Sequence, residues 1–133
     1  MRASNNETAI RKLVEDWARA VRARDLKAIL ANHSPEMLMF DVPPPLASRG
    51  IAAYRKTWEL FFSWSDDPVV FDFDEMNVTS GDDVAYVTAL MRCAGTETNG
   101  KSIKLGFRLT MGLRKIRGQW TVMHEHHSIP ATS

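Results

Sequence analysis

The stretch Ser102-Ile-Lys-Leu-Gly-Phe-Arg-Leu-Thr-Met-Gly-Leu-Arg-Lys115 alternates large apolar residues with polar or small ones. In a β-strand, alternate residues point to opposite faces of the sheet. One face of this strand would carry Leu105, Phe107, Leu109, Met111 and Leu113. The other face would carry Gly106, Arg108, Thr110 and Gly112. Strands usually have about 5–6 residues, so this stretch predicts one strand of an unusually long sheet.

The neighbouring segments extend this pattern through the second half of the chain. Residues 69–79, 84–97 and 120–128 are also rich in Val, Phe, Thr and Leu. They are separated by Ser80-Gly81-Asp82-Asp83, by Asn99-Gly100 and by Arg117-Gly118. Asn-Gly is a strong signal for a tight hairpin. The second half therefore predicts a four-stranded antiparallel meander.

The first half has the periodicity of helices. Apolar residues recur at helical spacing from Ile10 to Val21, and Asp25 can cap a second, short helix that His33-Ser34-Pro35 ends, with His33 as its last residue. A short strand is predicted at 37–42, a third helix from Ile51 to Phe62, and a turn at Asp66-Asp67-Pro68. Three helices and one long sheet can bury their apolar surface only if the sheet wraps around the helices. We expect a single α+β domain, residues 1–133, shaped as a cone with an internal pocket.

Composition excludes several classes of protein. The chain has 133 residues and a net charge of +1, with scattered Lys and Arg, so we expect no nucleic-acid partner. No apolar run approaches the ~20 residues of a membrane span, and the N-terminus lacks the apolar segment of a signal peptide. The single cysteine, Cys93, excludes an intramolecular disulfide. These features predict a cytoplasmic protein with neither membrane association nor a cofactor motif.

Asp41 is the first candidate for chemistry. It ends the apolar run Met37-Leu38-Met39-Phe40 and stands just before Pro43-Pro44-Pro45. A buried strand would leave its carboxylate partly desolvated, which suits a proton carrier. The alternative is a plain turn residue ahead of the prolines.

Three stretches together resemble one known group of proteins. They are Asp25-Leu-Lys-Ala-Ile-Leu30, Met37-Leu-Met-Phe-Asp41 and Gly50-Ile-Ala-Ala-Tyr-Arg-Lys-Thr-Trp58. Their order is similar to that in the nuclear-transport-factor-2-like superfamily, in particular its ketosteroid-isomerase and polyketide-cyclase-like (SnoaL-like) branch. The resemblance covers nearly the whole chain and implies a cystatin-like α+β roll.

The resemblance also implies roles for individual residues. Asp41 falls where ketosteroid isomerases keep their general base. Trp17 falls on the oxyanion-hole tyrosine and Thr110 on the protonated aspartate that completes the hole. His33 and Trp58 fall on two supporting tyrosines. Because both oxyanion donors are changed, the resemblance does not imply steroid isomerisation.

The same alignment assigns strand faces. It points Arg108 and Thr110 into the cavity, together with Met123, Glu125 and His127 from the last strand. Trp120, Val122, His124 and His126 would then lie on the outer face. The apolar residues of 105–113 would also be outside, forming a large patch for a monomer. We therefore expect a homodimer through the outer sheet face.

The segment His124-Glu125-His126-His127-Ser128 holds three of the four histidines. His124 and His126 have a spacing seen in metal sites, but no third ligand is assigned to their face, so no metal is expected. A polar strand end is the alternative reading for these two. Glu125 beside His127 can orient the imidazole, which favours an acid–base or ligand-contacting role for His127.

These features suggest a small-molecule enzyme of the isomerase, cyclase or lyase kind that needs no cofactor. Asp41 would move the proton, His127 with Glu125 would be the second acid–base group, and Arg108 would stabilise negative charge. Trp58, Trp17, His33, Thr110 and Met123 would complete the pocket. The alternative is a non-catalytic domain that binds a small anion or mediates assembly. Epoxide hydrolysis would need an Asp–Arg–Asp arrangement, for which no second aspartate is assigned.

Overall fold

The computed structural model describes residues 2–65 and 69–131, so the turn predicted at Asp66-Asp67-Pro68 lies outside the described residues. The first half contains α1 (Arg2–Arg22), α2 (Leu26–Leu30), β1 (His33–Phe40), β2 (Ser48–Arg49) and α3 (Ile51–Trp64). The second half contains β3 (Val70–Ser80), β4 (Val84–Thr96), β5 (Ser102–Ile116) and β6 (Gln119–Ser128). The order of helices and strands agrees with the sequence patterns, and β2 is an additional short strand.

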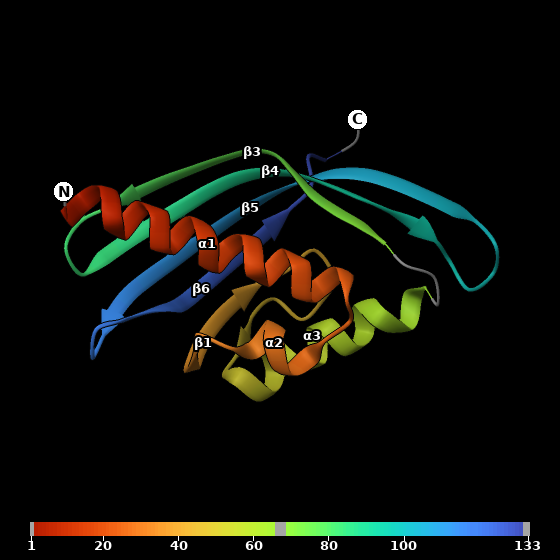
Figure 1. Ribbon diagram of the computed structural model, residues 1–133. Helices are drawn as coiled ribbons and strands as arrows, with labels where there is room; N and C mark the ends of the chain where they lie inside the picture. Colours follow the sequence, from red (N-terminus) through yellow and green to blue (C-terminus); the bar gives the residue numbers. More distant parts are fainter. Residues whose placement is uncertain (1, 66–68, 132–133) are drawn as a thin grey trace.

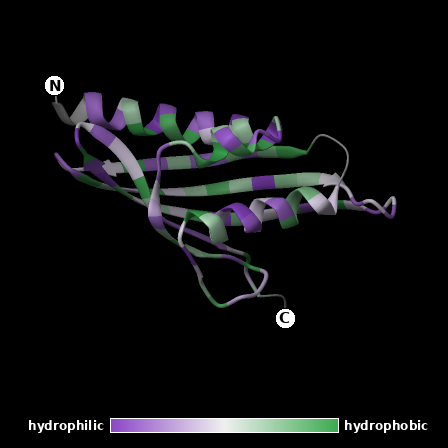
Figure 2. Cartoon of the chain, turned by 90° about the horizontal axis from the view of Figure 1, so that it is seen from below, coloured by the Kyte–Doolittle hydropathy of each residue, from purple (hydrophilic) through white to green (hydrophobic). Residues whose placement is uncertain are grey.

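All strands belong to one sheet with the order β2-β1-β6-β5-β4-β3. The pairs from β3 to β6 are antiparallel, as the hairpin signals predict, whereas β1 runs parallel to β6. The sheet is therefore mixed rather than purely antiparallel. Figure 1 shows the long strands curving over the helices, which confirms the α+β roll. Figure 2 shows hydrophilic and hydrophobic residues mixed along both long helices, and no helix of the described residues is long and apolar enough to cross a membrane.

Local sequence explains where the elements around β1 begin. The Asp25 side chain accepts a hydrogen bond from the Ala28 N–H at 3.1 Å and caps α2. Asn32 adopts a left-handed φ of 61°, and its carbonyl accepts a hydrogen bond from the Val122 N–H at 2.7 Å. This turn starts β1 at His33 instead of Met37, so His33 is a strand residue and not the end of a helix. Gly50, with φ of 90°, provides the positive φ before α3.

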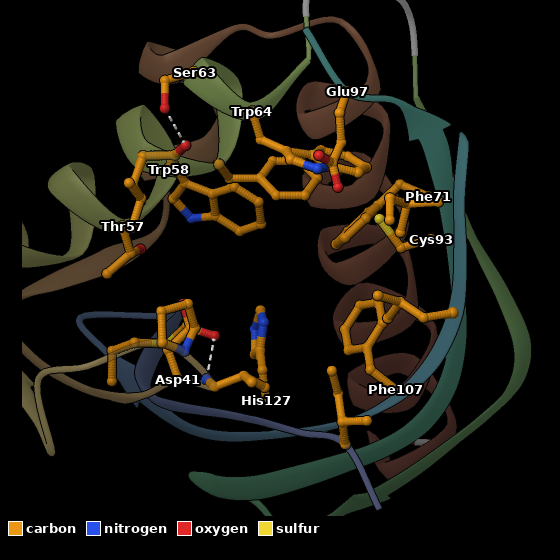
Figure 3. Close-up of a pocket in the computed structure, with 18 residues that line it drawn as sticks. Asp41, Thr57, Trp58, Ser63, Trp64, Phe71, Cys93, Glu97, Phe107 and His127 are labelled. Carbon is orange, nitrogen blue, oxygen red and sulfur yellow. Dashed lines mark hydrogen bonds between the residues drawn. The ribbon is translucent and has the colours of Figure 1, made fainter. Parts of the chain in front are cut away.

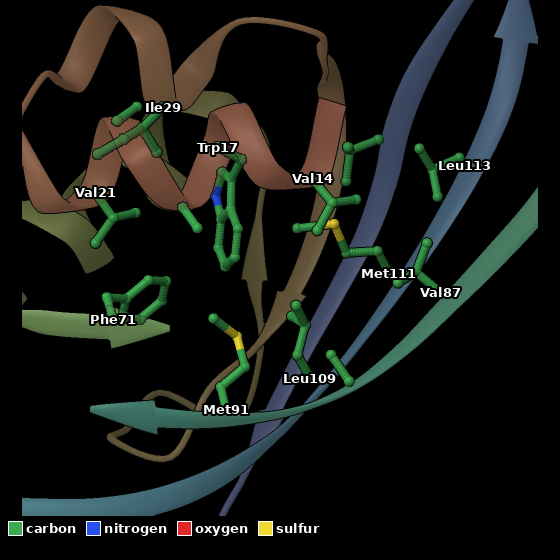
Figure 4. Close-up of a cluster of buried hydrophobic side chains, with 14 of the residues drawn as sticks. Val14, Trp17, Val21, Ile29, Phe71, Val87, Met91, Leu109, Met111 and Leu113 are labelled. Atoms are coloured by element: carbon green, nitrogen blue, oxygen red, sulfur yellow. The ribbon is translucent and has the colours of Figure 1, made fainter. Parts of the chain in front are cut away.

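The face assignment predicted for β5 is wrong. Leu109, Met111 and Leu113 are buried in the core, while Arg108 and Thr110 are exposed on the outer face. The register explains this, because Leu109 pairs with His127 and Met111 pairs with Glu125. Directly paired residues share one face of a sheet. Figure 4 shows the apolar residues of β4 and β5 packed against α1, so the patch on which the homodimer expectation rests is core.

A bulge in β6 corrects a second part of the assignment. Leu113 pairs with Val122 and Gly112 pairs with His124, which leaves Met123 as the extra residue. Such a bulge changes which residues face inward on its two sides. Trp120 and Val122 are therefore buried in the core, contrary to the prediction, while Glu125 and His127 face inward as predicted. Met123 is half-buried at the bulge.

Candidate functional site

A cavity of about 530 Å³ lies between α3, the end of β1 and the inner face of the sheet (Figure 3). Its wall is mainly apolar and rich in aromatic rings, from Trp58, Phe61, Trp64, Phe71 and Phe107. Ligand pockets typically combine such a wall with a few placed polar groups. The side chains here that can carry charge are those of Asp41, Glu97, His127 and Cys93. Burial raises the pKa of the Cys93 thiol to about 11, so this residue is an uncharged wall group at neutral pH.

Asp41 and His127 lie next to each other on the cavity wall (Figure 3). The parallel register pairs Met39 with Glu125 and Phe40 with His126, so the next residues of the two strands are Asp41 and His127. Asp41 is half-buried, and its Oδ1 accepts a hydrogen bond from the Val42 N–H at 2.8 Å. Both residues are in the pocket, as the sequence predicts.

Glu125 is the centre of a buried polar network behind this wall. Its Oε2 lies 2.5 Å from His33 Nε2 and accepts a hydrogen bond from the Tyr54 hydroxyl at 2.6 Å. Its Oε1 lies 3.1 Å from His127 Nε2. The Tyr54 oxygen in turn accepts a hydrogen bond from Trp17 Nε1 at 3.0 Å. The network thus joins both ends of the chain through α1, β1, α3 and β6.

The burial of this network changes how its groups titrate. Burial by itself would raise the pKa of Glu125, but hydrogen bonds and positive charge from His127 and His33 outweigh it and hold the pKa at about 2. Burial, followed by the negative charge of Glu125, raises the pKa of Tyr54 well above its usual value of 10. Glu125 is therefore a carboxylate and Tyr54 a neutral donor at neutral pH.

Five residues that were predicted to line the pocket lie elsewhere in the structure. Trp17 and His33 are buried in the supporting network and do not line the cavity. Arg108 lies on the outer face, where its Nε donates a hydrogen bond to Ser128 Oγ at 3.0 Å. Thr110 is exposed on the same face, and Met123 lies at the bulge outside the cavity. Trp58 lines the cavity as expected, and its buried Nε1 has no hydrogen-bond acceptor among the described residues.

The site also contains residues that the sequence patterns do not single out: Tyr54 in the network, and Thr57, Ser63 and Glu97 on the cavity wall. Tyr54 and Trp58 stand at helical spacing on the apolar face of α3, which reads as core packing. The signal for Tyr54 was its hydroxyl, since a buried tyrosine needs a partner. Glu97 follows β4 and enters the cavity opposite Asp41 (Figure 3).

The arrangement limits the chemistry that the site can perform. No Lys or Arg is among the described residues that line the cavity, so neither the Asp–Arg–Asp arrangement nor an arginine anion site is formed there. No three His, Cys, Asp or Glu side chains of the described residues group as metal ligands. A carboxylate and an imidazole remain side by side in an apolar cavity, which is a setting for proton transfer.

The fold is an α+β roll whose curved sheet encloses a cavity, with a carboxylate and an imidazole on the cavity wall. The chain belongs to the SnoaL-like domain family, whose sequence pattern matches residues 10–132. No curated protein matches the chain.

Solved structures agree with this assignment. An NTF2-like protein of unknown function from Pseudomonas putida KT2440 has 33% identity and a TM-score of 0.89, over 99% of this chain and 92% of that one. A ketosteroid isomerase-like protein from Erwinia carotovora atroseptica has 17% identity and a TM-score of 0.80, over 95% and 97%. A candidate dehydratase of the NTF2-like family from Streptomyces avermitilis has 12% identity and a TM-score of 0.84, over 98% and 99%. The last two likenesses show the fold alone.

Proposed function

We propose that the chain is a cofactor-independent isomerase, cyclase or lyase that moves protons on a small, mostly apolar carbonyl compound. One observation carries this proposal: Asp41 and His127 stand together on the wall of an apolar cavity, and buried Glu125 holds His127. The Streptomyces relative described as a candidate dehydratase would belong to the lyase group of these reactions.

The two residues would divide the proton transfers between them. Asp41 takes a proton from a carbon next to the substrate carbonyl. The electron pair of that C–H bond forms the new C=C bond, and the carbonyl π electrons move to oxygen. His127 donates a proton to this oxygen. Asp41 then returns its proton to the same or another carbon, the C=C electrons form the new C–H bond, and His127 takes its proton back as the carbonyl re-forms. Such positioned general bases typically contribute about 10²–10⁴ in rate.

The charges of the cavity favour a neutral substrate. Asp41 and Glu97 bring two carboxylates to the lining, and the described lining residues contain no Lys or Arg. An anionic ligand would lose its hydration and meet like charges. This argues for the carbonyl compound over the alternative of a small-anion-binding domain.

Deuterium uptake from D2O by a panel of bicyclic aromatic ketones and aromatic 1,3-diketones, starting with 2-tetralone, tests the proposal by proton NMR. We expect the protein to accelerate exchange at the α-carbon of at least one compound, and Asp41→Asn to slow it by about 10²–10⁴. Glu36→Gln is the matched control, because Glu36 is an exposed carboxylate on the same strand. Equal rates for the wild type and Asp41→Asn across the panel would overturn the proposal.

A further inference from the structure

We propose that Glu97 binds a hydroxyl group of the substrate, on the side of the cavity away from Asp41 and His127. The ligand then carries a carbonyl at one end, an apolar aromatic middle and a hydroxyl at the other end. This assigns the substrate to the hydroxylated aromatic ketones. The carbonyl end rests on the proposed function, whereas the hydroxyl contact at Glu97 does not.

Glu97 continues the inward-facing row of β4. In this strand the buried residues are the odd-numbered ones: Ala85, Val87, Ala89, Met91 and Cys93. Gly95 and then Glu97 follow in the same alternation, so Glu97 is the first charged side chain on an otherwise apolar or small row. Its half-buried side chain lines the cavity. A carboxylate at this position faces the enclosed space rather than the outer surface of the sheet.

The backbone fixes the place of Glu97. Its N–H donates a hydrogen bond to the Lys101 carbonyl at 2.8 Å, and its carbonyl accepts one from the Gly100 N–H at 2.8 Å. The next residue, Thr98, donates its N–H to the Trp64 carbonyl at 3.1 Å, which ties this hairpin to the end of α3. Only the side chain of Glu97 therefore has to be ordered when a ligand binds, which lowers the entropy cost of the contact.

The protein supplies no donor to the Glu97 carboxylate. Within residues 2–65 and 69–131, no N–H or O–H group donates a hydrogen bond to it and no Lys, Arg or His makes an ion pair with it. Its surroundings are apolar: Trp64 packs against Gly95, where a Cβ would lie 3.3 Å from the indole ring, and Ile103 pairs with Gly95 across the hairpin. A hydrogen bond to a carboxylate is stronger than one between neutral groups, so a ligand that brings a donor gains affinity here.

The cavity has two polar sides with an apolar space between them. Figure 3 shows Glu97 and Trp64 on one side and Asp41 and His127 on the other. The rings of Trp58, Phe71 and Phe107 contribute to the wall that joins the two sides. A volume of about 530 Å³ lies within the usual range for small-molecule sites. The arrangement suits a flat aromatic ligand with one polar group at each end.

A hydroxyl fits the Glu97 side better than an ammonium group or an anion does. A hydroxyl has one proton, which a single carboxylate satisfies, whereas an ammonium group has three donors. The donors that Glu97 leaves unpaired would meet the apolar side chains of Trp64 and Ile103, and burying them would cost free energy. An anion would be repelled by the carboxylate.

Matched pairs of phenols and methyl ethers test the contact by isothermal titration calorimetry at pH 7.5. The pairs are 6-hydroxy- and 6-methoxy-2-tetralone, 7-hydroxy- and 7-methoxy-2-tetralone, and 4-(4-hydroxyphenyl)- and 4-(4-methoxyphenyl)butan-2-one. The three pairs differ in where the oxygen stands relative to the carbonyl. We expect the wild type to bind the phenol of at least one pair about tenfold more tightly than its ether, because the ether cannot donate. Equal affinities within all three pairs, or no binding of any compound, would overturn the proposal.

Glu97→Leu removes the acceptor and keeps an apolar side chain of similar length. We expect the affinities of phenol and ether to become equal within about twofold, while Glu97→Gln keeps part of the preference because its amide oxygen still accepts. Glu59→Leu is the matched control, since Glu59 is an exposed carboxylate on α3 that does not line the cavity. An unchanged preference in Glu97→Leu would contradict the inference. If the variants do not fold, the wild-type comparison decides.

Deuterium exchange with the same ketones separates this inference from the proposed function. A hydroxyl preference that depends on Glu97, without any exchange at carbon, would count against the proposed function alone. Exchange that Asp41→Asn slows, with equal affinities for phenols and ethers, would count against this inference alone. Tighter binding of the cation 2-aminotetralin than of every phenol would also overturn it, in favour of an ammonium site.

Discussion

Tyr54→Phe removes one oxygen atom from the centre of the buried network. The Tyr54 side chain is completely buried, its hydroxyl donates to Glu125 at 2.6 Å, and its oxygen accepts from Trp17 Nε1 at 3.0 Å. The phenyl ring of the variant keeps the packing against Trp58 and His33. The change therefore isolates the hydrogen bonds from the apolar contacts.

The expected cost follows from these two bonds. A hydrogen bond to a charged acceptor contributes roughly 1.5–3 kcal/mol, and a buried donor left without a partner costs roughly 1–3 kcal/mol. The two effects share one oxygen and are not fully additive. We expect the free energy of unfolding to fall by about 3 kcal/mol, a large part of the ~5–15 kcal/mol of an ordinary domain.

Urea unfolding followed by circular dichroism measures this loss. Tyr86→Phe is the control, because the chain has only two tyrosines and Tyr86 is 51% exposed on the outer face. We expect the control to stay within about 0.5 kcal/mol of the wild type. A Tyr54→Phe variant as stable as Tyr86→Phe would refute the view that this network is a structural support of the site.

Two further predictions test the electrostatics of the network and the orientation of the sheet. The pKa of Glu125 is lowered from 4.5 to about 2, so its contribution to stability is complete above about pH 4.5 and is lost as the pH falls to about 2. Between pH 6 and pH 2 the wild type should lose about 3 kcal/mol more than Glu125→Gln in urea unfolding, and equal losses would contradict this. Leu109→Ala should cost about 2–5 kcal/mol because Leu109 is 1% exposed, while Leu90→Ala, at a residue 47% exposed, should cost less than about 1 kcal/mol; the reverse order would restore the predicted strand faces.

The order of elements could be predicted because each has a local physical cause. The alternation of β5, the Asn99-Gly100 hairpin and the Asp25 cap all act within a few residues of the chain. Local patterns of this kind are reliable when they agree with one another. The places of Asp41 and His127 in the cavity have a different source, because the resemblance to ketosteroid isomerases implied them.

The alternation of apolar and polar residues in β5 does not by itself show which face of the strand points to the core. The pattern separates Leu109 and Met111 from Arg108 and Thr110, but the choice of the inner face depends on what packs against the strand. The resemblance to ketosteroid isomerases implies an inward Arg108. Burial of the large apolar residues outweighed that analogy, because an inward Arg108 would need a buried partner.

Two features place Asp41 and His127 together on the inner face of the sheet: the bulge in β6 and the parallel pairing of β1 with β6. Neither feature has a local signature in the sequence. Without the extra residue Met123, a strand that buries Trp120 and Val122 would turn Glu125 and His127 outward. The bulge leaves one trace in the sequence: the buried residues are even-numbered before it, at Trp120 and Val122, and odd-numbered after it, at Glu125 and His127.

The parallel direction of β1 has a separate effect. If β1 were antiparallel to β6, the end of β1 would lie near the start of β6, and Asp41 would be separated from His127 by about 3.3 Å for each intervening residue. Because the strands are parallel, their ends coincide, and a carboxylate from the first half of the chain meets an imidazole from its last strand. The meeting of Asp41 and His127 is thus a property of the topology rather than of any single segment.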